Sequence, residues 1–264
     1  MGGHRGSLTG APGKLDVVLH PLLDLLLPVD CGGCGVPGPV LCPDCDRLLG
    51  PPVRVYPPYC AAGPPVYALG TYRGRLRAAL LAYKERGRRD LAAPLGSALA
   101  SAVHSLETER GHSGLRNRSM SPERPGSVCL VPVPSRGVAA ARRGGQHVTL
   151  LARWAAVGLA GAGVPAAVAP ALRLAFGVRD SVGLAPAARQ ANLAGRVLPR
   201  RAGLPPAGTP VVLIDDVVTT GATAAACAAA LLQTGVEVPA IVVLAAAGCH
   251  TPSYLPAGRY LSQC

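Results

Sequence analysis

Residues 211–223 read VVLIDDVVTTGAT, an apolar run followed by two acids and a turn rich in threonine. The unbroken apolar run, Val211–Ile214, is typical of a strand that is buried on both faces of a parallel sheet. After Asp215 and Asp216 the turn opens a helix that we expect over Gly221–Gln233. This order of strand, acids, turn and helix predicts an α/β protein with a ligand crevice at the carboxyl ends of its strands.

The acidic pair and the turn have the chemistry of a site for a phosphorylated sugar. Asp215 and Asp216 can accept hydrogen bonds from the vicinal hydroxyls of a ribose and can help to hold a divalent cation. A turn that enters a helix directs free backbone amides outwards, where the helix dipole favours an anion. We expect a 5-phosphate at the turn, which consists of Thr219, Thr220, Gly221, Ala222 and Thr223. The alternative is an ordinary buried strand followed by a threonine helix cap.

Strand and helix patterns alternate over residues 66–246, which predicts a mostly parallel sheet flanked by helices. Apolar runs indicate further strands at Val66–Tyr72, Val128–Val133, Ala169–Phe176 and Val238–Ala246. Apolar periodicity and helix-start signals indicate further helices at Arg75–Arg86, Leu91–Glu107 and Pro186–Val197. The segment Arg142–Val157 is expected to begin as a loop and to become helical around Leu150. We therefore expect one α/β domain over residues 61–248, with a mobile loop at 109–127.

Four cysteines near the N-terminus have the spacing of a metal site, Cys31-x2-Cys34-x7-Cys42-x2-Cys45. Two such knuckles can bring four thiolates to one tetrahedral zinc ion, and because no coordination position stays open, the zinc is expected to be structural. Two disulfides are the alternative, which the lack of a convincing secretion signal disfavours. Cys129 and Cys227 fall in expected core elements, where a free thiol acts as a small apolar side chain.

Composition and charge narrow the class of protein. The chain has 264 residues, 49% of them hydrophobic, and a formal net charge of +12. That charge suits a polyanionic partner, or it serves only solubility. Pro165 and Pro170 interrupt the uncharged stretch Trp154–Leu172, so we expect no membrane span. We also expect a cytoplasmic location, a disordered leader at 1–14, a helix and cysteine module at 15–60, and a tail at 249–264.

Groups suited to a diphosphate follow the strand expected at Val128–Val133. The chain continues into Pro134, Ser135 and Arg136, where backbone amides and a guanidinium can hold the two phosphates. Arg143 lies in the basic segment that comes next. We expect this arginine either to close over bound substrate or to lie at a solvated helix start.

Two further residues are open to more than one interpretation. Lys84 comes near the end of an expected helix and is either another phosphate ligand or part of an ordinary exposed face. His147 is expected to be a surface histidine rather than a catalytic base.

The 211–223 stretch resembles the phosphoribosyl-pyrophosphate (PRPP) motif of type I phosphoribosyltransferases. The resemblance implies the fold of those enzymes and a Mg²⁺-dependent reaction at the anomeric carbon of PRPP, with pyrophosphate as the leaving group. It implies catalytic roles for Asp215 and Asp216. It also implies PRPP-binding roles for Lys84, Pro134, Ser135, Arg136, Arg143 and the turn 219–223. The acceptor, a base or an amine, is left open.

Joined to a four-cysteine zinc-ribbon module, this domain resembles the ComF family of bacterial competence-associated proteins. Supporting stretches are Leu25–Pro28, Tyr72–Arg77 with Lys84, Val131–Pro134, and Val182–Leu184 with Arg189 and Asn192. The chain departs from the family pattern at Gly63, where many members carry a second cysteine after the one matching Cys60, at Ser181, and in the segment 143–147. A second metal site is therefore not expected.

Two classes of function follow from this resemblance. In the first the protein is an enzyme that transfers the phosphoribosyl group of PRPP to an unidentified acceptor. In the second it is a non-catalytic accessory or ligand-sensing factor in DNA uptake, recombination or repair, with DNA or DNA-processing proteins as partners. The sparse aromatic residues, 3% of the chain, disfavour a stacking platform for single-stranded DNA.

Overall fold

The strand that carries the acidic pair, β7 (Val211–Val218), lies inside a six-stranded sheet with the order β1-β2-β8-β7-β3-β4. Five of these strands run parallel to their neighbours, and only β1 pairs antiparallel, at one edge. The other strands are β1 (Val53–Val55), β2 (Val66–Thr71), β3 (Val128–Pro132), β4 (Ala166–Val168) and β8 (Ala240–Ala246). This arrangement confirms an α/β fold with a mostly parallel sheet.

The computed structural model describes residues 30–110, 127–134, 146–175 and 196–248. The expected leader, the first helix of the cysteine module, most of the expected loop 109–127 and the expected tail lie outside the described residues. Among the helices within these ranges, none combines the length and the apolar character that a membrane span requires. The stretch Trp154–Leu172 contains a helix end, a turn, the short strand β4 and the first residue of the next strand.

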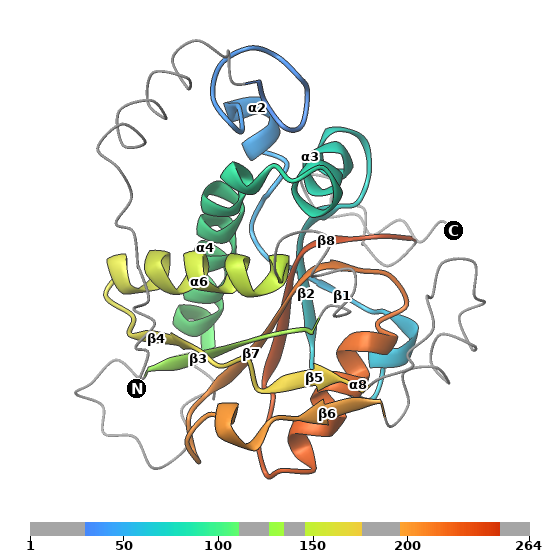
Figure 1. The fold of residues 1–264 in the computed structure, drawn as a ribbon, viewed down its shortest axis with the longest axis vertical. Coiled ribbons are helices and arrows are strands. Elements are labelled where there is room, and N and C mark those ends of the chain that lie inside the picture. The colour runs from blue at the N-terminus through green and yellow to red at the C-terminus, as the bar shows by residue number, and fades with distance from the viewer. Residues whose placement is uncertain (1–29, 111–126, 135–145, 176–195, 249–264) are drawn as a thin grey trace, which may run out of the picture.

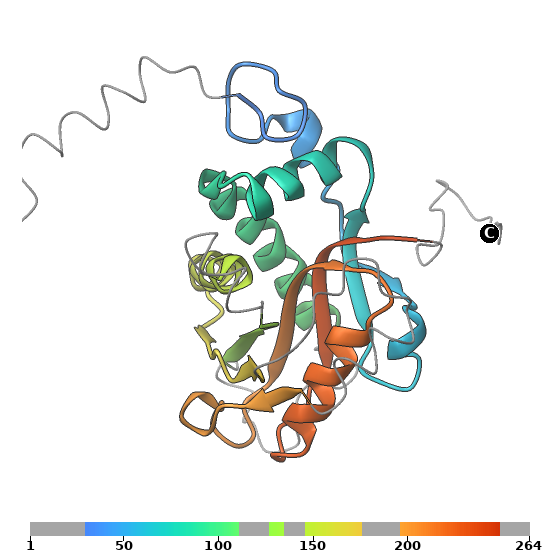
Figure 2. The same cartoon turned by 45° about the vertical axis from the view of Figure 1, so that its right-hand side comes forward.

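Helices cover both faces of the sheet (Figure 1; Figure 2). One face is covered by α3 (Gly74–Glu85), α4 (Ala92–Arg110) and α6 (His147–Gly161), whose leucines and alanines form one apolar core with β7 residues Val212 and Ile214. The other face is covered by α8 (Ala222–Leu232), which forms a second core with Val211 and Leu213. The two cores use alternate residues of β7 because successive side chains of a strand point to opposite faces.

Three elements differ from the sequence-based expectation. β7 continues four residues beyond Ile214, so the acidic pair lies within the strand. β5 (Leu172–Leu174) does not join the main sheet but pairs antiparallel with β6 (Val197–Pro199), where we had expected the end of a helix. Pro170 lies just after β4 and has no N–H to offer to a ladder, which is consistent with the chain leaving the main sheet there. α6 begins at His147, three residues before Leu150, around which we expected the segment to become helical.

The Pro-rich stretch 50–60 is part of the fold. It supplies β1 and the short 3-10 helix η1 (Pro58–Cys60), which contacts α8. Two other 3-10 turns, η2 (Arg89–Leu91) and η3 (Arg201–Gly203), link larger elements. The described part of the cysteine module contains one short α-helix, α2 (Pro43–Asp46).

Candidate functional site

Asp215 and Asp216 are consecutive residues of β7, so alternation along the strand directs their side chains to opposite faces of the sheet, although the two carboxylates still interact with each other. Asp216 follows Ile214 toward the face covered by α3 and α6, where it meets Lys84 and His147. Asp215 follows Leu213 toward α8, and its charge, after burial, helps to raise the pKa of Cys227 in that helix. The sequence-based expectation that both acids face one ribose did not allow for a strand that continues through both of them.

Asp216 is buried and fully engaged with protein groups. Its Oδ2 lies 2.9 Å from Nζ of Lys84 and 3.0 Å from Nε2 of His147, and its Oδ1 accepts the backbone N–H of Val217 at 2.7 Å. Burial alone favours the neutral acid, but the hydrogen bond from His147 and the charge of Lys84 outweigh it. They hold the pKa of Asp216 well below its usual range. The carboxylate is therefore ionised and bonded to groups from three elements, α3, α6 and β7.

His147 is a buried residue and not the surface histidine that we expected. Only 4% of it is exposed. The hydroxyl of Tyr83 donates to its backbone oxygen at 2.6 Å, and the two rings meet edge to face. Because a carboxylate only accepts hydrogen bonds, the contact with Asp216 assigns the proton of the imidazole to Nε2. Within the described residues Nδ1 has no hydrogen-bond partner.

Asp215 has a different environment. It is half-buried, and its Oδ1 accepts the backbone N–H of Asp216 at 2.8 Å. Among the described residues no lysine, arginine or histidine forms an ion pair with it. Burial and the neighbouring charge of Asp216 raise the pKa of Asp215 well above its usual value, and the more distant Lys84 offsets this only in part. An acid in this state is stabilised by a cation or a hydroxyl donor.

The turn after β7 has the geometry of an anion site. Thr219 is exposed, Thr220 and Thr223 are half-buried, and α8 begins directly after Gly221. No side chain caps this helix, so its first amides have no partner within it and remain able to bind an anion. Gly221 has the left-handed conformation, with φ at 81°, that glycine adopts without steric cost.

The turn is supported by a segment distant in sequence. The backbone N–H of Tyr59 in η1 donates to the carbonyl of Thr220 at 3.1 Å, and the thiol of Cys60 lies 3.4 Å from the carbonyl of Gly221. A Cβ at residue 221 would lie 2.8 Å from Cβ of Pro57. Sequence reasoning missed this support, although the unusual run of prolines around Tyr59 was a signal of a rigid segment.

The strand beside β7, β3, brings Pro134 to the same end of the sheet as the acidic pair. β3 pairs with β7 up to the level of Ile214, whose carbonyl accepts the backbone N–H of Val133 at 2.9 Å. Pro134 follows and is buried. The other residues expected to bind the diphosphate from this side, Ser135, Arg136 and Arg143, lie outside the described residues.

A pocket of about 280 Å³ adjoins the Lys84–Asp216–His147 cluster. It lies where the end of α3 meets the start of α6, and it is lined by Tyr83, Lys84, Glu85, Arg86, Gly87, Arg89 and His147. Lys84 is the sequence-predicted residue that the fold brings to the acidic pair, and about a third of its side chain stays exposed. A larger, open groove of about 670 Å³ lies elsewhere, between the cysteine module and α3.

The four cysteines of the module converge on one point. The sulfur atoms of Cys31, Cys34, Cys42 and Cys45 all lie within 4.8 Å of one another, and those of Cys34 and Cys42 are 3.6 Å apart. A tetrahedral zinc–thiolate centre places its sulfurs roughly 3.8 Å apart. These sulfurs are free thiols rather than disulfide bridges. The four cysteines therefore form a cluster that fits a zinc ion.

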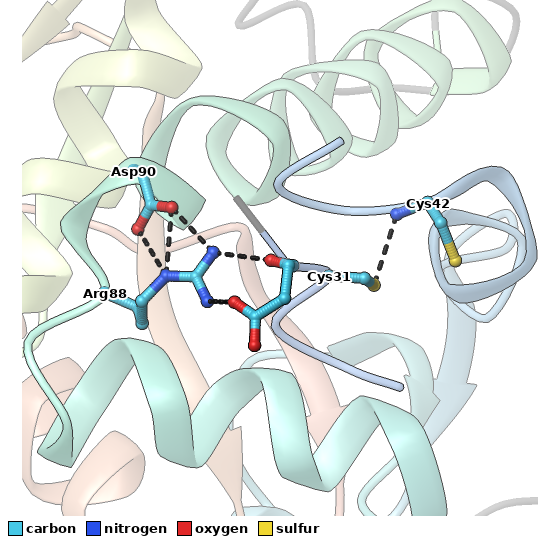
Figure 3. Close-up of polar contacts among 5 residues, drawn as sticks. Cys31, Cys42, Arg88 and Asp90 are labelled. Carbon is cyan, nitrogen blue, oxygen red and sulfur yellow. Dashed lines mark hydrogen bonds and ion pairs between the residues drawn. The ribbon is translucent and has the colours of Figure 1, made fainter. Parts of the chain in front are cut away.

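Backbone groups favour the thiolate form of one cysteine of this cluster, Cys31. Burial by itself raises the pKa of Cys31, but hydrogen bonds from the backbone N–H groups of Cys42, Cys34 and Gly33 outweigh it and lower the value to about 6. The bond from Cys42 is drawn in Figure 3. A Cβ at Gly33 would lie 2.7 Å from the sulfur of Cys45, so only glycine fits beside the cluster.

Arg88 fastens the module to the rest of the protein. Its guanidinium donates to the carbonyl and to the carboxylate of Asp30, both at 2.8 Å, and also to the carboxylate of Asp90 (Figure 3). Gly32 allows the close approach of the module, since a Cβ there would lie 2.6 Å from Cδ1 of Leu91. The cysteine cluster is thus tied to the turn that follows α3, the helix that carries Lys84.

Comparison with known proteins finds no family model and no curated protein that matches this chain. The function of the site is therefore inferred from its geometry and from the sequence. Cys129 and Cys227 are buried core residues, as the sequence predicts.

Proposed function

We propose that the protein binds PRPP and Mg²⁺ at the carboxyl end of β7 and is a phosphoribosyltransferase, with a fold of the type I class. The observation that carries the proposal is that three suitable groups follow one another at the end of β7. Asp215, which forms no ion pair with the described residues, is followed by a glycine turn and the uncapped start of α8. The 5-phosphate is assigned to the amides and hydroxyls of residues 219–223, and the ribose to Asp215.

The ligands of the diphosphate are assigned to residues beside the carboxyl end of β7. Pro134 lies two residues beyond the end of β3, the strand beside β7, and Lys84 forms an ion pair with Asp216. Mg²⁺ would neutralise charge on the leaving pyrophosphate, and oxygen ligands such as the Asp215 carboxylate suit that ion. The protein's own contribution is to hold the sugar and the diphosphate in a fixed relation, because positioning and electrostatic stabilisation supply most of the rate in such a reaction.

We further propose that the cysteine cluster holds one structural zinc ion and that the chain is a relative of the ComF family. The separations of the four sulfurs support zinc. The position of the cluster, tied through Arg88 to the turn after α3, supports a role in holding that helix over the strand ends. The family assignment rests on the sequence resemblance.

Calorimetric titration with PRPP and Mg²⁺ tests the proposed site. Wild-type protein is expected to bind, and Asp215→Asn to bind about 10–100-fold more weakly, the usual effect of losing a charged hydrogen-bond partner. Arg153→Gln, which removes an exposed charge on α6, is the control and should bind as wild type does. If the wild-type protein shows no heat of binding, the proposed PRPP site is wrong.

Release of pyrophosphate separates an enzyme from a sensor. Wild-type protein with PRPP is offered a panel of nucleobases and amines, and pyrophosphate is measured. Release with one acceptor supports transfer. Binding of PRPP without release with any acceptor would leave a ligand-sensing function in place of the enzyme.

One observation favours the accessory function as a second candidate. Arg73, Arg75 and Arg77 are exposed at the start of α3, beside the cysteine module. Clustered arginines bind phosphate backbones, and such binding weakens steeply with salt. Salt-dependent DNA binding that is lost on changing the three arginines to glutamine, but kept in Asp215→Asn, supports this candidate.

A further inference from the structure

Asp216 has little left to offer a ligand. Both lone pairs of Oδ2 are used, one by Lys84 at 2.9 Å and one by His147 at 3.0 Å, and Oδ1 accepts a backbone N–H at 2.7 Å. Only 4% of the residue is exposed. A carboxylate that is bonded and buried in this way would have to break existing contacts before it could bind a sugar hydroxyl.

The neighbouring acid has what Asp216 lacks. Asp215 is half-buried, points to the opposite face of the sheet, and is paired with no cation among the described residues. It also precedes the turn that leads into α8, which lies on its own side of the sheet. The two acids, adjacent in sequence, are therefore in different environments.

Lys84 is the group through which Asp216 can act on a ligand. An ammonium has three N–H donors, and one is directed to Asp216. The side chain is 34% exposed and lines the 280 Å³ pocket together with Arg86 and Arg89. Glu85 also lines this pocket, so the lining residues from the end of α3, the turn after it and η2 carry three positive charges and one negative.

His147 completes the arrangement. It is the first residue of α6, so its position sets where the amino end of that helix faces the pocket. It is held from two sides, by Asp216 through Nε2 and by the hydroxyl of Tyr83 through its backbone oxygen. Asp216 thus fixes both Lys84 and the start of α6 relative to the pocket.

We propose that Asp216 is a positioning residue that, with His147, fixes Lys84 at a binding pocket for the diphosphate end of the ligand, and that Asp215 alone of the acidic pair contacts the sugar. This inference rests on the proposed function, because it divides one PRPP site between two halves. It adds the pocket at the junction of α3 and α6 to that site and removes Asp216 from the sugar contacts.

The experiment titrates the full chain separately with two halves of the ligand, ribose 5-phosphate and inorganic pyrophosphate, each with Mg²⁺. Lys84→Gln and Asp216→Asn are expected to weaken pyrophosphate binding about 10-fold or more and to change ribose 5-phosphate binding less than about 3-fold. Asp215→Asn is expected to do the reverse. Lys84→Arg keeps the charge and should retain most of the affinity for pyrophosphate.

Several controls keep the test decisive. Arg153→Gln, an exposed charge on α6, should bind both halves as wild type does. If Asp216→Asn proves too unstable to titrate, Lys84→Gln decides, because its partly exposed side chain is not needed for the core. Wild-type pyrophosphate affinity in Lys84→Gln, or selective loss of ribose 5-phosphate in Asp216→Asn, overturns the inference.

The outcomes also separate this inference from the proposed function. If the wild-type protein binds PRPP but Asp215→Asn and Asp216→Asn lose the same half of the ligand, only the division of roles is wrong. If the wild-type protein binds pyrophosphate through Lys84 but neither ribose 5-phosphate nor PRPP, the anion pocket stands and the PRPP site fails. If the wild-type protein binds none of the three ligands, both are wrong.

Discussion

The thiol of Cys60 contacts the backbone of Gly221 across 161 residues of sequence, with 3.4 Å between the sulfur and the glycine carbonyl oxygen. The contact brings η1 against the turn that we assign to the 5-phosphate. A Cβ on residue 221 would lie 2.7 Å from that sulfur, so the approach needs a glycine. The shape of the turn therefore depends on residues 57–60 as much as on its own sequence.

Gly221→Ala is expected to destabilise the protein by about 2–4 kcal/mol, through the left-handed backbone and through overpacking against Cys60 and Pro57. Gly208→Ala is the matched control. Gly208 has nearly the same φ, 78° against 81°, but a Cβ there meets nothing within 4 Å. Urea unfolding of both variants should show the larger loss for Gly221→Ala. Equal losses would mean that the contact with η1 contributes nothing.

Asp215→Asn is expected to stabilise the ligand-free protein at pH 7, on the order of 1 kcal/mol. The folded state raises the pKa of Asp215, so the ionised acid is disfavoured there relative to the unfolded chain. Below the unfolded pKa, about 4, both states carry the proton and the cost disappears. The stabilisation should therefore shrink as the pH falls toward 4. Unfolding in urea between pH 4 and 7 measures it.

Asp216→Asn is expected to have the opposite effect and to lower the free energy of unfolding by about 1–3 kcal/mol at pH 7. The folded state lowers the pKa of Asp216, so its contribution is present above the unfolded pKa and is lost as the pH falls through the folded value. This loss of stability is smaller than the loss expected when one partner of a fully buried ion pair is removed, because Lys84 remains partly hydrated. A variant more stable than wild type would contradict the ion-pair arrangement described here.

Purified protein is expected to carry one zinc ion per chain, and Cys45→Ser is expected to lose it. Cys129→Ala removes a buried thiol far from the cluster in sequence and should keep the metal. Because a metal that binds only the folded state stabilises it, chelation should lower the free energy of unfolding by roughly 3–5 kcal/mol. Elemental analysis checks the first two results. Two disulfides without bound metal would overturn the zinc assignment.

Gly33→Ala tests the fit of the cluster without removing a ligand. A Cβ at this position would lie 2.7 Å from the sulfur of Cys45, so we expect a zinc affinity at least 10-fold weaker, measured by competition with a chelator. Gly161→Ala, where a Cβ meets nothing within 4 Å, should leave the affinity unchanged. An unchanged affinity in Gly33→Ala would show that the cluster tolerates the added methyl group.

The amino-acid sequence by itself determined the features that depend on neighbouring residues. The apolar runs predicted β2, β3 and β8 to within a few residues, since a strand buried on both faces needs continuous apolar side chains. They also predicted where β7 begins, but not that it continues past the acidic pair. The spacing of Cys31, Cys34, Cys42 and Cys45 likewise predicted that they cluster, because two short turns suffice to bring the four sulfurs together.

Only the tertiary structure decided how the site is divided. Asp215 and Asp216 are equivalent in sequence, but the continuation of β7 to Val218 turns them to opposite faces. Which face holds Lys84 and His147 depends on how α3 and α6 dock, and the support of Gly221 depends on η1. These contacts join residues from 64 to 161 positions apart. Local periodicity does not record such pairings, since they arise when separate elements bury their apolar faces together.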